Sequence, residues 1–168
     1  MSRYYELSTD PAVLRQRAGH IRYNATRQGT AITMQYERLA ANMHINPEDL
    51  AAEAWTSHMR AVADLDFLVT SVRRLLRVAE QTRSFRLDPK NELKVNIKIF
   101  NSRWRPHLVK IRNALEHIDE PAMYFVPIRG GGAIAFAYPG GEVDARKLYI
   151  SAAKLHKAIC SVIEPFEG

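Results

Sequence analysis

The feature that most constrains the fold is a long helical stripe in the second quarter of the chain. Small and apolar residues recur there at alternating steps of four and three: Ala51, Trp55, His58, Val62, Leu65, Val69, Val72, Leu76 and Ala79. This is the period of one face of an α-helix. Asn46 and Pro47 supply a capping residue and a proline at the first helical position, so we expect a helix over about 47–83.

The same period predicts three more helices, over about 10–43, 90–118 and 144–164. We expect Gly29 to break or kink the first of them, because glycine weakens a helix interior. Pro106 predicts a kink or local break in the third, because proline cannot donate the backbone hydrogen bond of a helix.

Between the last two helices the pattern changes to short aromatic and β-branched runs, which predict a β-hairpin over about 123–138. Three consecutive glycines, 130–132, form its turn, and a Pro-Gly-Gly sequence at 139–141 ends it. The glycines lack the Lys-Ser/Thr pair of a phosphate-binding loop. No repeat or long linker divides the chain. The sequence therefore predicts one all-α domain over 1–168, four-helix-bundle-like with a short β-hairpin insertion before the last helix.

The composition limits which kinds of functional site the chain can form. Cys160 is the single cysteine, which excludes an internal disulfide and a multi-cysteine zinc site, and we find no base near it in the sequence. The six histidines show no metal-ligand spacing, so we expect neither metal nor cofactor. No apolar run approaches the roughly 18–20 residues that span a membrane, and no signal-peptide pattern opens the chain. We expect a cytoplasmic protein without a membrane partner.

Positive charge is concentrated in one stretch. The chain has a net charge of +6, yet residues 73–112 hold twelve basic and only three acidic residues. Such a stretch is typical of a protein that binds a phosphate backbone, although a solvated helix face explains it as well. We take RNA as the expected partner. The candidate RNA-binding residues are Arg73, Arg74, Arg77, Lys94, Lys98, Arg103, Arg105 and Lys110.

Late in the third expected helix stand Arg112, Asn113 and, after three further residues, His117. This pattern resembles the ribonuclease signature of the HEPN superfamily, whose members are helical bundles that carry it in a comparable position. The resemblance implies a metal-independent endoribonuclease that leaves 2′,3′-cyclic phosphate ends, with these three residues catalytic. It also implies a role as a toxin or phage-defence effector or in RNA processing, and a possible antitoxin partner.

The spacing supports a composite site independently. Asn113 and His117 are four residues apart and share a helix face that points away from the stripe of Leu108 and Ile111. A homodimer that packs two such helices together would bring two copies of this segment into one cleft. Imidazole can act as acid or base near neutral pH, guanidinium binds phosphate oxygens, and an amide can orient either group.

Two other interpretations stay open. In the first, Arg112 and Glu116 form an ordinary ion pair four residues apart, His117 complements the helix dipole, and the chain is a non-catalytic RNA-binding or protein-interaction module. In the second, a regulatory bundle binds a small anion or nucleotide.

Overall fold

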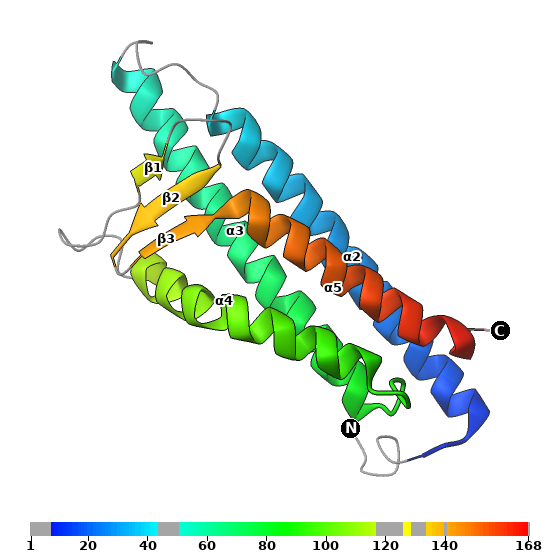
Figure 1. The fold of residues 1–168 in the computed structure, drawn as a ribbon. Helices are drawn as coiled ribbons and strands as arrows, with labels where there is room; N and C mark the ends of the chain where they lie inside the picture. The colour runs from blue at the N-terminus through cyan, green and yellow to red at the C-terminus, as the bar shows by residue number, and fades with distance from the viewer. Residues whose placement is uncertain (1–7, 44–50, 117–125, 129–133, 140, 168) are drawn as a thin grey trace.

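A computed structural model describes residues 8–43, 51–116, 126–128, 134–139 and 141–167. The described residues confirm the helical bundle with a small antiparallel sheet before the last helix (Figure 1). The helices are α2 (Pro11–Met43), α3 (Ala51–Ser84), α4 (Glu92–Glu116), α5 (Ala145–Ile163) and the short 3-10 helix η1 (Glu164–Phe166). The expected start of α3 near residue 47 lies outside the described residues. None of the described helices has an apolar stretch long enough to span a membrane.

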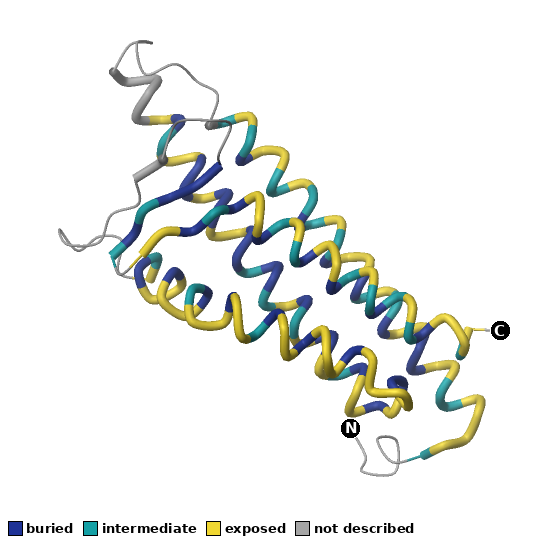
Figure 2. Tube along the Cα trace, viewed as in Figure 1, coloured by how far each residue is buried: buried dark blue, intermediate teal, exposed yellow. Residues whose placement is uncertain are grey.

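The core forms where α2, α3, α4 and α5 meet along their lengths (Figures 1 and 2). The inner faces supply the expected stripes, and residues such as Leu65, Ile111 and Leu155 are buried. Burial of apolar surface stabilises this arrangement by about 25 cal/mol per Å². Arg17 is the largest fully buried side chain, and it donates to the carbonyl oxygens of Ser8 and Phe85, at 2.9 and 3.1 Å.

Two of the described helix ends have their backbone groups capped. The Asp10 carboxylate accepts a 2.8 Å hydrogen bond from the Ala12 amide at the start of α2. At the end of α3, Arg86 has a φ of 61°, and the Leu87 amide donates back to the Thr82 carbonyl at 3.1 Å. This is a Schellman motif, in which a left-handed residue satisfies the last carbonyls of the helix. It turns the chain from α3 into α4.

The sheet has one more strand than expected. Strands β1 (Val126–Ile128), β2 (Ala135–Tyr138) and β3 (Gly141–Asp144) pair antiparallel in that order. The predicted hairpin ends where β3 begins, because four residues with a single buried side chain, Val143, carry too little alternation to indicate a strand. Asp144 ends β3 and caps α5, since its carboxylate accepts from the Lys147 amide at 2.8 Å.

The described helices show no break at either position, since α2 runs without interruption through Gly29 and α4 through Pro106. The expected break is therefore wrong at both positions, and a kink stays a prediction. At Gly29 the packing shows what the missing side chain makes room for. A Cβ atom placed there would lie 3.0 Å from the His156 Nε2 atom of α5, so the glycine provides room for an imidazole ring. Pro106 lies on the exposed side of α4.

Candidate functional site

The motif lies at the end of α4 that is next to the sheet (Figure 1). Arg112 and Asn113 are both exposed in the last turns of the helix. His117 lies outside the described residues, so its expected catalytic position stays a prediction. The His107 Nδ1 atom lies 3.0 Å from the Tyr138 hydroxyl of β2, and this bond ties the same part of α4 to the sheet. Burial raises the pKa of Tyr138, so its hydroxyl stays protonated at neutral pH.

Arg112 has a local partner. Its Nε atom lies 2.6 Å from the Glu116 carboxylate, and both side chains are about half exposed. An exposed pair of this kind contributes only about 0–1 kcal/mol. A phosphate can therefore compete with Glu116 for the guanidinium at a small cost, and the remaining guanidinium nitrogens can bind its oxygens.

The outward side of α4 carries an apolar row that the protomer core does not explain. Positions 95, 99, 102, 106, 109 and 113 follow steps of four and three, and they point away from the buried Leu108 and Ile111. Val95, Ile99 and Val109 within this row are 58%, 62% and 51% exposed. We call the row the outer stripe. It leads along the helix to Asn113.

Basic side chains flank the outer stripe on both sides. Five of the candidate RNA-binding residues, all on α4, are exposed: Lys94, Lys98, Arg103, Arg105 and Lys110. The seven-residue spacing of Lys98, Arg105 and Arg112 places them along one flank, and Arg103 and Lys110 lie along the other. The structure thus gathers these residues with Arg112 and Asn113 on one helix.

The remaining three candidates lie on α3. Arg73 is half-buried, and Arg74 and Arg77 are exposed. Within the described part of the chain, no hydrogen bond or ion pair joins these arginines to Arg112 or Asn113. The basic stretch of the sequence is therefore divided between two helices.

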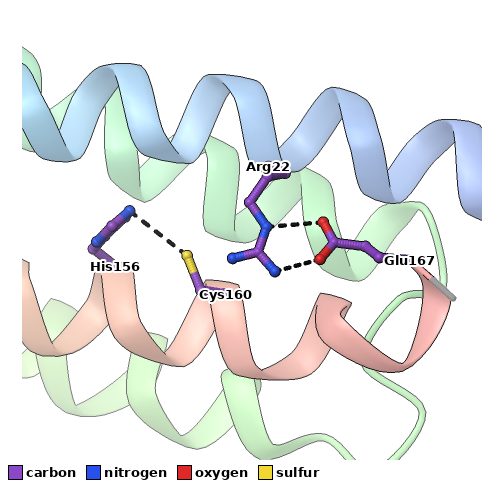
Figure 3. A network of polar contacts seen from close by, with 4 residues as sticks. All are labelled: Arg22, His156, Cys160 and Glu167. Carbon is purple, nitrogen blue, oxygen red and sulfur yellow. Dashed lines mark hydrogen bonds and ion pairs between the residues drawn. The ribbon is translucent and has the colours of Figure 1, made fainter.

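A second polar cluster joins α2 to α5 and η1 (Figure 3), and we call it the α2–α5 seam. The Arg22 guanidinium binds the Glu167 carboxylate through two contacts, one of them a 2.8 Å bond from Nε. The Cys160 Sγ atom lies 3.6 Å from the His156 Nε2 atom, one helical turn away. The expectation that no base lies near Cys160 is therefore wrong. The signal was present in the sequence, since residues four apart on a helix are neighbours.

The seam satisfies its charges internally. The hydrogen bond from Arg22 lowers the pKa of Glu167, and the same bond raises the pKa of Arg22. Burial lowers the pKa of His156, and the positive charge of Arg22 lowers it further, so the imidazole is neutral at neutral pH. No group of three metal-ligating side chains occurs among the described residues. The seam therefore acts as a contact between helices.

Two exposed lysines of α5, Lys154 and Lys157, lie outside the basic stretch of the sequence. Both line a cavity that α5 shares with Glu92 and Asn96 of α4. The charge count missed them because it followed a single stretch of sequence, whereas the fold places a later helix beside that stretch. Their spacing of three on the polar side of an amphipathic helix was the available signal.

No protein-family model, curated protein or solved structure matches this chain. The site must therefore be interpreted from its own geometry and chemistry.

Proposed function

We propose that this protein is a metal-independent endoribonuclease of the HEPN type that acts as a homodimer. The observation that carries the proposal is the placement of Arg112 and Asn113, exposed at the end of an apolar stripe that has basic residues on both flanks. The helical-bundle fold and the resemblance of the motif support it. A toxin or defence role, with an antitoxin as partner, is the biological setting that the resemblance implies.

The reaction needs three operations: deprotonation of the 2′-hydroxyl, stabilisation of the pentavalent phosphate and protonation of the leaving 5′-oxygen. His117 takes the proton of the 2′-hydroxyl, whose oxygen attacks the adjacent phosphorus. Arg112 stabilises the negative charge of the pentavalent phosphate, and Asn113 orients that phosphate or the imidazole. A second imidazole protonates the leaving 5′-oxygen. The products are a 2′,3′-cyclic phosphate and a free 5′-hydroxyl.

A second copy of the chain supplies the second imidazole and guanidinium. Asn113 lies on the outer stripe, so a partner that covers the stripe also approaches the motif. The two α4 helices must then cross near Val109 and Asn113. An antiparallel pair centred on Ser102 would instead separate the two Asn113 residues by about 33 Å, at 1.5 Å per residue.

The alternative is a non-catalytic RNA-binding or protein-interaction module. The ion pair between Arg112 and Glu116 favours it, because the guanidinium already has a carboxylate partner. In that case the outer stripe would bind another protein, and the basic flanks would contribute affinity without chemistry.

Substitution of the histidine tests the proposal directly. The variant His117→Ala should lower the rate of RNA cleavage by at least about 100-fold, the usual contribution of a general acid or base. His20→Ala is the matched control, since His20 is an exposed histidine of α2 whose ring contacts Asn24. Cleavage by the parent protein should persist in EDTA and yield 2′,3′-cyclic phosphate ends. Equal rates for His117→Ala and the parent would overturn the proposal.

The ion pair gives a second comparison. Arg112→Ala should reduce cleavage strongly, whereas Glu116→Ala should retain or raise it, because it releases the guanidinium for phosphate. If the pair only stabilises the helix, both variants should lose the same few tenths of a kcal/mol of stability and leave cleavage unchanged. Cleavage rates and thermal unfolding of the two variants separate these outcomes.

A further inference from the structure

A groove runs between α4 and α5, away from the motif residues themselves. It consists of three adjoining cavities of about 140, 280 and 380 Å³. Asn96 and Lys154 line both the first and the second, and Glu92 and Ser161 line both the second and the third. The shared walls make the cavities one continuous feature, which we call the α4–α5 groove.

The walls of the groove carry more positive than negative charge. Arg103, Lys154, Lys157 and Lys90 line it along its length. Two acidic residues also line it, Glu92 and Asp88, but Asp88 is buried and its carboxylate accepts a 3.1 Å hydrogen bond from the Lys94 amide. The groove is therefore suited to an anionic ligand.

The lining also includes apolar surface. Ile99 contributes the exposed apolar surface at one end, above the buried Phe100 and Leu155, and Val162 and Phe166 contribute at the other. Cations beside apolar and aromatic surface are the combination with which proteins hold single-stranded nucleic acids, since phosphates bind the cations and bases cover the apolar groups.

The groove side of α4 continues towards the motif. Asn96 and Arg103 line the groove seven residues apart, and Lys110 stands seven residues further on the same flank. In the sequence, the next position of this row is His117. A strand bound in the groove is therefore directed along α4 towards the motif.

We propose that the α4–α5 groove binds single-stranded RNA and guides it to the motif. This inference rests on the proposed ribonuclease function and adds the path of its substrate. It assigns RNA contacts to Lys154 and Lys157, which lie outside the basic stretch of the sequence.

Charge reversal in the groove tests this path. In a His117→Ala background, Lys154→Glu with Lys157→Glu should weaken binding of a fluorescent single-stranded 12-mer RNA at least 10-fold by anisotropy. The slope of log affinity against log salt should fall by about 1.4, at about 0.7 per phosphate contact. Arg15→Glu with Arg27→Glu is the control, because these exposed residues of α2 give the same change in net charge. It should change affinity less than 3-fold.

Several results would contradict the proposal that RNA follows the groove. Equal weakening by the groove and α2 pairs would show a general charge effect, and equal weakening for a duplex of the same sequence would exclude a single-strand site. A third result would assign the groove to an acidic protein: a polyglutamate peptide binds more tightly than RNA, and the substitution of Lys154 and Lys157 abolishes that binding. The cleavage assay on the parent protein separates the two proposals. If the parent cleaves RNA but the groove pair binds normally, only the path fails; if the parent does not cleave but the groove pair loses binding, only the nuclease fails.

Discussion

The α2–α5 seam and the outer stripe of α4 are two helix surfaces that differ in whether their side chains have partners within the protomer. In the seam, polar groups find partners in the same chain: Arg22 binds Glu167, and His156 lies between Gly29 and Cys160. On the outer stripe, Val95, Ile99 and Val109 point outward. The contacts within one protomer therefore account for the residues of the seam but not for the exposed apolar residues of the stripe.

This contrast separates residues that stabilise the fold from residues available for binding. Single exposed apolar side chains are common on protein surfaces. A row of them at helical spacing, with basic flanks and the motif at its end, is the pattern of a surface that another molecule covers. Substitutions in the seam should therefore change stability with little effect on function, and those in the stripe should do the reverse.

The largest effect is expected on the outer stripe. Ile99→Asp with Val109→Asp should convert the dimer to a monomer and abolish cleavage, because two carboxylates would be buried at the contact. The stability of the protomer should change by less than about 1 kcal/mol, since both positions are exposed. Sedimentation velocity and thermal unfolding measure the two quantities. Tyr23→Asp, at an exposed site on α2, is the control and should remain dimeric. A variant pair that stays dimeric would contradict the assignment.

Disulfide trapping determines where the two α4 helices cross in this contact. In a Cys160→Ser background, Val109→Cys should form an intermolecular disulfide, because a crossing near the motif brings the two copies within the Cα distance of about 7 Å that a disulfide allows. Ser102→Cys should not. The reverse result, seen on a non-reducing gel, would indicate an antiparallel pair and separate the two motifs.

A smaller effect is expected from two glycines of α2. Gly19→Ala should stabilise the protein by about 0.4–1 kcal/mol, since nothing lies within 4 Å of the added methyl group and alanine favours helices. Gly29→Ala should lose this gain or destabilise, because the methyl group would press on the His156 ring at 3.0 Å. Chemical denaturation of both variants gives the comparison. Equal stabilisation would show that the imidazole moves freely.

The smallest effect is the pH dependence of the seam. The folded state lowers the pKa of His156, so it binds fewer protons than the unfolded state near pH 6. The contribution of His156 to the free energy of unfolding is fully present above pH 6.5, the pKa of histidine in the unfolded state. It decreases as the pH falls from 6.5 towards the lower pKa of the folded state. His156→Gln should therefore flatten the decrease in unfolding free energy between pH 7.5 and 5.5. An unchanged slope would mean that the other histidines cause it.

Strong, local periodicity made the helices predictable. The stripe through Leu65 repeats every three or four residues of sequence, and the structure buries it as expected. Strand β3 was not predictable in this way, because only its pairing with β2 makes a strand of residues 141–144. The interruption expected at Gly29 was wrong for a similar reason, since the residue that explains the glycine is on α5.

The candidate site was predictable only in part. The spacing placed Asn113 on the face that points away from the stripe of Leu108 and Ile111, and Asn113 is exposed. The charge count treated Arg74 and Arg105 as one basic stretch, although the predicted helices already placed them on two different helices, as the structure confirms. It also omitted Lys154, which only the packing of α5 on α4 brings beside them.

The bond between Arg22 and Glu167 has a mechanical consequence. It joins α2 to the residue after η1, at the end of the bundle opposite the sheet (Figure 1). A force that pulls residues 8 and 167 apart therefore loads this contact, together with the Arg17 bonds at the start of α2, before the contacts nearer the sheet, and it peels α2 away one turn at a time. Peeling breaks contacts in sequence and needs less force than shearing two helices past each other. The protein should yield at low tension from this end, while the sheet and the motif end of α4 give way last.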